Sequence, residues 1–190
     1  MHLPIVVLAA PLSSGKTTVC EYLRTKNFVG IEVPRYVYHL LNMDFRKRNV
    51  PRLMWIPELI DATKKAGVDT VASSLLEELY SMYNSDVKGF VLCGLRDIEL
   101  LKAIQSKHKK LINIVIKTEI PTAFAWSKER MDNRDPVTID EYSIVVESEI
   151  KYIENMSKVF NFIVINNNST LECLFQQIDD ILDSNDLVTQ

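Results

Sequence analysis

The first 26 residues place a buried strand, a tight loop and a helix in immediate succession, and this order constrains the fold strongly. Residues 3–9 form a continuous apolar run, which is typical of a strand buried on both faces of a parallel sheet. A loop of small residues follows, and residues 16–26 then have the apolar spacing of a helix. A strand that feeds a helix through a short loop is the repeating unit of doubly wound α/β sheets.

The rest of the chain repeats this alternation. Apolar runs at 28–33, 88–93, 111–116 and 160–166 predict four more strands. Helical spacing is found at 34–48, at 57–83 with an interruption near Gly67, and at 97–107, 121–131, 138–157 and 170–182. Thr138 and Glu141 form a capping box at the start of one of these helices. We therefore predict an α/β, three-layer fold with a five-stranded parallel sheet, the first strand in its centre and helices on both faces.

The loop after the first strand carries the most specific motif. Residues 10–17 read Ala-Pro-Leu-Ser-Ser-Gly-Lys-Thr, close to the phosphate-binding pattern G-x-x-x-x-G-K-[ST] in the strand–loop–helix context that this pattern requires. Backbone N–H groups at a helix N-terminus bind phosphate, Gly15 lets them approach, Lys16 meets the β and γ oxygens, and the Thr17 hydroxyl ligates Mg²⁺. We expect ATP or GTP with Mg²⁺ to bind here, through Ser13, Ser14, Gly15, Lys16, Thr17 and Thr18.

One position departs from this motif. Ala10 stands where the first glycine is expected. Alanine costs little there if the residue has a negative φ, and more if φ is positive. A chance match and a degenerate loop without turnover are the two alternatives to an active site.

A second segment adds a family resemblance. Together with the loop, residues 91–97 (Val-Leu-Cys-Gly-Leu-Arg-Asp) resemble the nucleoside monophosphate kinase-like P-loop proteins, which include adenylate, cytidylate and dephospho-CoA kinases and an archaeal set of related kinases. Many of them have Asp-Gly-hydrophobic-Arg at this strand end. Gly94 and Arg96 match, and the resemblance implies that Arg96 holds substrate phosphate. Cys93 replaces the aspartate that organises Mg²⁺ in those proteins, and Asp97 is only a weak substitute.

The third segment resembles the arginine-bearing lid of the same kinases. Arg130 and Arg134 follow the fourth predicted strand and are four residues apart, so on a helix they project from one face. Guanidinium groups bind several phosphate oxygens and keep their charge. The resemblance implies a short lid at about residues 128–137 whose arginines are catalytic, together with Lys16 and Arg96. A solvated charged turn is the structural alternative.

The acceptor side is less specific. In this architecture the substrate-binding helices follow the second strand, where basic and aromatic side chains gather. Arg35 and Arg52 are the residues we expect to bind an acceptor phosphate, and Tyr36 and Trp55 are candidates for stacking on a base. Tyr36 and Trp55 can equally be core residues.

Composition sets the broad class. With 190 residues, 47% hydrophobic residues and 25% charged residues, the chain fits one domain, which we expect over residues 1–183, with a flexible tail at 184–190. The net charge of −3 indicates no broad nucleic-acid surface. No apolar run approaches the ~18 residues of a membrane span. The three cysteines are far apart in sequence and indicate buried free thiols in a cytosolic protein.

These observations favour a kinase that transfers a phosphoryl group from Mg-ATP to a small phosphorylated acceptor, most simply a nucleoside monophosphate or related nucleotide. Two alternatives remain at this point. One is an NTPase whose acceptor is water, and the other is a non-catalytic nucleotide-binding regulator, which Ala10 and Cys93 favour. The sequence indicates neither the acceptor base nor the oligomeric state.

Overall fold

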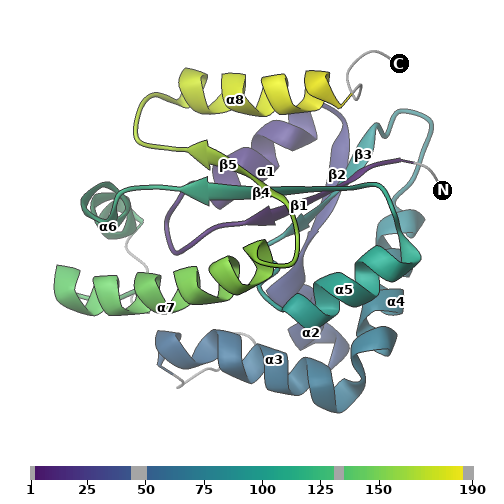
Figure 1. The fold of residues 1–190 in the computed structure, drawn as a ribbon, viewed down its shortest axis with the longest axis horizontal. Coiled ribbons are helices and arrows are strands. Elements are labelled where there is room, and N and C mark those ends of the chain that lie inside the picture. The colour runs from purple at the N-terminus through teal and green to yellow at the C-terminus, as the bar shows by residue number, and fades with distance from the viewer. Residues whose placement is uncertain (1–2, 44–50, 131–134, 186–190) are drawn as a thin grey trace.

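A computed structural model describes residues 3–43, 51–130 and 135–185 of the chain. Its centre is one sheet of five parallel strands in the order β2-β3-β1-β4-β5 (Figure 1). The strands are β1 (Ile5–Ala9), β2 (Phe28–Glu32), β3 (Gly89–Cys93), β4 (Leu111–Lys117) and β5 (Phe162–Asn166). The five-stranded parallel sheet and the central place of β1 are therefore confirmed.

The helices of the described residues connect these strands, except for α8, which follows the last strand. They are α1 (Lys16–Thr25), α2 (Val33–Leu40), the 3-10 helix η1 (Arg52–Met54), α3 (Trp55–Ala66), α4 (Val68–Ser81), α5 (Ile98–Lys107), α6 (Ile120–Glu129), α7 (Ile139–Ser157) and α8 (Leu171–Ser184). Gly67, with φ +89°, separates α3 from α4 as predicted. The predicted helix at 34–48 is shorter in the structure, because α2 ends at Leu40; residues 44–50 lie outside the described residues.

Alternate residues of β1 divide the core into two layers. Ile5, Val7 and Ala9 pack into the larger cluster with α2, α4, α5 and α7. Val6 and Leu8 face the opposite side and pack with α1 and α8. Figure 1 shows this arrangement, with α1 and α8 above the sheet and the other helices, apart from α6, below it. Because side chains alternate across a strand, a strand that is fully buried over all five residues needs a layer on each face.

The carboxyl ends of the strands define the edge where the loops with chemical groups lie. Leu8 of β1 pairs with Cys93 of β3, which in turn pairs with Glu32 of β2. In parallel sheets these ends lie at the same edge, so the loop at 10–15 and the segments after β2 and β3 are neighbours. α6 lies beyond the carboxyl end of β4, on the left in Figure 1.

The structure also bears on three smaller features of the sequence, which are apolar helices, the capping box and the cysteines. No helix of the described residues is long and apolar enough to cross a membrane. The capping box of Thr138 and Glu141 is present at the start of α7. Among the thiols, Cys20 and Cys93 are buried as expected, whereas Cys173 is exposed, because it lies on the outer face of the surface helix α8.

Candidate functional site

The loop between β1 and α1 has the backbone geometry of an anion site. Ser13 has φ +56° and Gly15 has φ +87°, both in the left-handed region. Gly15 is the N-cap of α1, and no side chain caps the helix there. The first turn of α1 also contains no acidic residue. The unpaired N–H groups and the positive end of the helix dipole are thus free to meet a phosphate.

Three side chains from distant segments fix the loop by donating to its carbonyl groups. Tyr142 Oη donates to the Leu12 carbonyl over 2.7 Å, and burial raises the pKa of Tyr142 to about 12, so that it keeps its proton. Asn167 Nδ2 donates to the Ser14 carbonyl over 3.2 Å, and Thr118 Oγ1 reaches the same carbonyl over 3.4 Å. All three bonds use loop carbonyls as acceptors, so none of them occupies a loop N–H group.

Ala10 fits the loop without backbone strain. It is completely buried, and it is not among the described residues with positive φ. Its carbonyl accepts a 2.7 Å hydrogen bond from Arg96 Nη2. Since a Cβ is costly mainly where φ is positive, alanine at this position does not by itself argue against a working loop.

A cavity of about 380 Å³ opens in front of the loop. Four cationic side chains and two carboxylates line it, which leaves the lining net positive. Aromatic and apolar side chains from α2, α3 and α6 form the remaining wall. The lining residues are Pro11, Leu12, Ser13, Ser14, Gly15, Lys16, Thr17, Thr18, Glu32, Pro34, Tyr38, Arg52, Trp55, Ile56, Leu59, Arg96, Trp126, Arg130 and Glu149.

Arg96 joins the loop to α7. Besides the Ala10 carbonyl, it binds Glu149, with Nη2 3.2 Å from Oε2. Both side chains are mostly buried, at 13% and 8% exposure. A buried carboxylate of this kind needs a charged partner, so Glu149 and Arg96 hold each other at the rim of the cavity.

Arg52 and Arg130 meet at one carboxylate, Asp135. Arg52 Nη1 donates to Asp135 Oδ1 over 2.8 Å, and Arg130 Nη2 contacts Asp135 Oδ2. The guanidinium of Arg52 also lies over the Trp55 ring, 4.6 Å from its centroid. Burial lowers the pKa of Arg52 from its ordinary value, and the charge of Asp135 opposes this shift. The Asp135 side chain is 4% exposed, so this carboxylate is enclosed by its two arginines.

The structure brings most of the predicted site residues together. All six predicted nucleotide-binding residues and Arg52, Arg96 and Arg130 line the cavity. Arg35 is exposed on α2 and does not line it. Arg134 lies outside the described residues. Tyr36 donates to the Ser74 carbonyl over 3.0 Å, away from the cavity lining, whereas Trp55 lines it.

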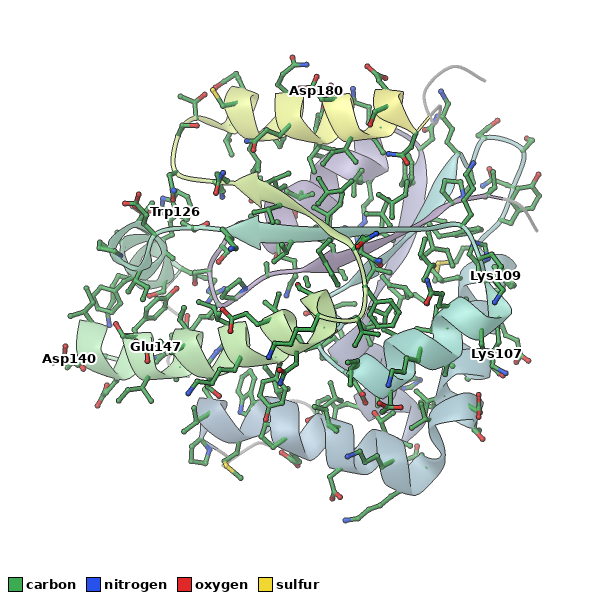
Figure 2. The ribbon with its side chains drawn as sticks, in the orientation of Figure 1. Lys107, Lys109, Trp126, Asp140, Glu147 and Asp180 are labelled. Carbon is green, nitrogen blue, oxygen red and sulfur yellow. The ribbon has the colours of Figure 1, made fainter. Side chains whose placement is uncertain are left out.

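Sequence reasoning missed several lining residues, among them Glu149, Glu32 and Trp126. Glu32 is exposed at the carboxyl end of β2, and it was detectable as the first charged residue after an apolar strand. Trp126 of α6 also lines the cavity, and Figure 2 shows it beyond the end of the sheet; its place in an amphipathic helix carried no signal of this role.

Solved structures give the same topology over the whole chain. The protein TT1252 from Thermus thermophilus is 16% identical, with a TM-score of 0.64, and the match covers 97% of this chain and 98% of that one. The chain has the P-loop kinase fold. A gluconokinase from Sinorhizobium meliloti 1021 matches at 11% identity and TM-score 0.60 over 97% and 94% of the two chains. A dephospho-CoA kinase from Campylobacter jejuni matches at 17% identity and TM-score 0.53 over 95% and 98%. No protein-family model and no curated protein matches the sequence.

Within this P-loop kinase fold, Cys93 lies next to the phosphate loop. Cys93, Lys16 and Thr17 line a second cavity of about 80 Å³. The thiol of Cys20 donates to Cys93, which raises the pKa of Cys20 and lowers that of Cys93. Asp97 lines neither of these two cavities. Its Oδ1 accepts from the N–H groups of Glu99 and Leu100 and caps α5.

The residues present fit a magnesium ion that is bound mainly by nucleotide and water. Thr17 is exposed at the start of α1, beside Lys16 in the cavity lining. The described part of the chain has no group of three or more His, Cys, Asp or Glu side chains that could hold a metal by themselves. Mg²⁺ in phosphoryl-transfer sites takes one or two protein ligands and completes its shell with phosphate oxygens and water, so a single hydroxyl ligand is chemically sufficient.

Proposed function

We propose that this chain transfers the γ-phosphoryl group of ATP or GTP to a small phosphorylated acceptor, a nucleoside monophosphate or a related nucleotide. The observation that carries the proposal is the shared cavity. A phosphate loop and three arginines from separate segments, Arg52, Arg96 and Arg130, line the same net-positive space. Phosphoryl transfer needs little covalent chemistry from the protein, because it depends on positioning and on stabilising charge.

The nucleotide end of the cavity is the N-terminus of α1. Backbone N–H groups of the loop bind the β-phosphate, and the Lys16 ammonium meets the β and γ oxygens. The Thr17 hydroxyl would hold Mg²⁺. When bound, the ion would neutralise part of the phosphate charge. The loop N–H groups, Lys16 and Thr17 all contact the triphosphate before the reaction begins. These residues therefore contribute to nucleotide binding as well as to turnover.

The acceptor end combines cations with flat side chains. Arg52 is held between Asp135 and the Trp55 ring, and such a guanidinium is ready to bind phosphate oxygens in a fixed plane. Arg96 stands between the loop and Glu149, where an acceptor phosphate would approach the γ-phosphoryl group. Trp55, Trp126 and Tyr38 also line this space, and aromatic rings of this kind are suited to stacking on a base.

The lid supplies the residues that act in the transition state. Arg130 is at the C-terminal end of α6 and lines the cavity. Its charge, with that of Arg134, would meet the developing charge on the transferring phosphoryl group. A lid that closes over both substrates also excludes water, which would otherwise compete as acceptor.

The three free cysteines support a reducing compartment, and we place the reaction in the cytosol.

One observation favours slow phosphoryl transfer, or none, by this chain. Cys93 stands where the resembling kinases have an aspartate, and the described part of the cavity lining offers only Glu32 and Glu149 as carboxylates. Glu149 is already paired with Arg96. A nucleotide-binding regulator with little turnover is therefore the second candidate function.

An acceptor screen tests the proposal. ADP release is followed with Mg-ATP alone and with a panel of nucleoside monophosphates, dephospho-CoA and unphosphorylated nucleosides, with Lys16→Ala as the background control. We expect one phosphorylated acceptor to raise ADP release well above the basal rate. A basal rate that no acceptor changes would favour an NTPase. Binding of ATP, seen as a rise in melting temperature, without any ADP release would favour the regulator.

A further inference from the structure

Two of the three cysteines lie together beneath the phosphate loop, and the proposed transfer uses neither. Cys20 is on α1, one turn after Lys16 and on the same helix face. Cys93 is the last residue of β3. Their exposed fractions are 9% and 8%. Both belong to the core cluster between α1 and the sheet, and both line the cavity of about 80 Å³ that Lys16 and Thr17 also line.

The fold places the two thiols at the same small cavity. Cys93 is in a strand that is paired on both sides, with Leu8 of β1 and with Glu32 of β2. Cys20 is in the helix that follows β1 directly, and it lines the same small cavity as Cys93. A bond between the two sulfurs would therefore join the phosphate-binding helix to the strand end beside it, at a site where the backbone geometry is already fixed on both sides.

We propose that Cys20 and Cys93 are a redox modification site that a hydroperoxide closes into a disulfide, and that closure weakens nucleotide binding at the phosphate loop. The second half of this inference rests on the proposed function. The first half depends only on the thiol pair.

The chemistry balances with one hydrogen peroxide molecule. The sulfur of Cys93 attacks one peroxide oxygen, the O–O bond breaks, and the departing hydroxide takes up the thiol proton and leaves as water, so that Cys93 becomes a sulfenic acid. The sulfur of Cys20 then attacks the sulfur of Cys93, the S–O bond breaks, and the hydroxyl leaves with the Cys20 proton as a second water. The two thiols lose two electrons and the peroxide gains them. The cavity of about 80 Å³ has room for the small oxidant.

The same geometry connects the thiol pair to Lys16. Gly94, directly after Cys93, lies so close to this lysine that a Cβ there would be 3.4 Å from Lys16 Nζ. A disulfide that draws α1 towards the end of β3 would move the lysine and the helix N-terminus relative to each other. Because coupling free energies are reciprocal at equilibrium, bound nucleotide should in turn make the disulfide easier to reduce.

The first experiment maps the bond. The full chain is prepared as Cys173→Ser, because the exposed Cys173 could link two molecules. After treatment with hydrogen peroxide and alkylation of the remaining thiols under denaturing conditions, we expect an intact mass lower by two hydrogen atoms and a peptide that joins Cys20 to Cys93. Restoration by dithiothreitol should accompany it. Alkylated Cys20 together with a sulfinic or sulfonic Cys93 would overturn the disulfide.

The second experiment measures nucleotide affinity with a fluorescent ATP analogue before oxidation, after it, and after re-reduction. We expect the dissociation constant to rise roughly 5-fold or more, the usual range of coupling between two sites. Cys20→Ser should bind nucleotide normally and lose the response to peroxide. A mapped disulfide with unchanged affinity would overturn the regulatory half. A reduced protein that binds no nucleotide would overturn the proposed function and this regulatory half together, while the mapped bond still decides the first half.

Discussion

Arg52 and Asp135 are 83 positions apart in sequence, yet Arg52 Nη1 lies 2.8 Å from Asp135 Oδ1 in a nearly closed environment. The second oxygen of the same carboxylate accepts a hydrogen bond from Arg130 Nη2. One carboxylate thereby joins the acceptor side of the cavity to the lid segment, and it does so with two of the three arginines on which the proposed function depends. Neither arginine can take a new position without giving up a charged hydrogen bond, so Asp135 sets where both of them start.

Replacing this carboxylate should loosen both arginines. Asp135→Asn keeps the shape of the side chain but removes its charge, and hydrogen bonds to charged groups contribute about 1.5–3 kcal/mol each to stability. We expect the free energy of unfolding to fall by about 1–3 kcal/mol in urea titrations. The matched control is Asp61→Asn, which breaks the exposed ion pair with Lys65 and should leave the stability unchanged. Equal effects of the two substitutions would contradict the role given to Asp135.

The loop glycine should be irreplaceable for two separate reasons. Gly15 has φ +87°, and a Cβ there would collide with Nδ2 of Asn167, the side chain that fixes the loop. Gly15→Ala should therefore abolish detectable ATP binding by calorimetry. Gly67→Ala is the control, because Gly67 has φ +89° but lies between α3 and α4, away from the cavity lining. It should cost about 1–2 kcal/mol of stability through backbone strain and leave ATP binding intact.

The buried carboxyl of Asp97 should make the stability of the protein depend on pH. Burial raises the pKa of its carboxyl, although the N–H groups of Leu100 and Glu99 lower it in part. The folded state therefore keeps this proton to higher pH than the unfolded state does. The stability that Asp97 contributes is complete below its unfolded pKa of about 4 and is lost as the pH rises through the folded value.

Asp97→Asn keeps the cap of α5 and removes this titration, since asparagine is as good an N-cap as aspartate. Relative to wild type, the variant should become more stable as the pH rises from about 3 to 7, measured by urea unfolding at each pH. A difference that stays constant with pH, or that changes in the opposite direction, would refute the raised pKa. Asp97→Ala loses the cap as well and should cost about 0.5–2 kcal/mol.

The fold was predictable because its signals are local and repeated. The apolar run at 5–9 has no polar interruption, and only a strand covered on both faces buries such a run. The capping box at Thr138 and the left-handed break at Gly67 also depend on few neighbours. The end of α2 at Leu40 was missed because helical spacing continues beyond it in the sequence, while tertiary contacts decide where a short helix stops.

The site was predictable only where a motif coincided with the edge of the sheet. Lys16 and Thr17 follow from the loop pattern, whose geometry is set within eight residues. The partnership of Arg52 with Asp135 and that of Arg96 with Glu149 join segments far apart along the chain. No periodicity or spacing carries such a pairing, because it arises when α7 packs beside η1 and the phosphate loop. Glu32 was overlooked although the sequence carried a signal for it, the charged residue that ends an apolar strand.

The lid arginines provide the sharpest distinction between a kinase and an NTPase. Arg130→Ala should leave ATP affinity within about a few-fold and lower phosphoryl transfer by ~10² or more, because its charge is needed chiefly in the transition state. Arg134→Ala should behave in the same way. Lys16→Ala should damage both affinity and transfer, since its contact with phosphate exists in the ground state too.

Lys128→Ala is the matched control for the lid. Lys128 is exposed on the last turn of α6, donates to the Pro136 carbonyl over 3.0 Å, and does not line the cavity. The Lys128→Ala substitution removes a positive charge two residues before Arg130, so a general electrostatic effect would appear in Lys128→Ala and Arg130→Ala alike. Full activity in Lys128→Ala beside a hundredfold loss in Arg130→Ala would tie the effect to the guanidinium in the cavity. The opposite result would be that Arg130→Ala and Arg134→Ala hydrolyse ATP as fast as wild type and that no acceptor raises ADP release above the basal rate. It would mean that no lid arginine contacts the transferring phosphoryl group.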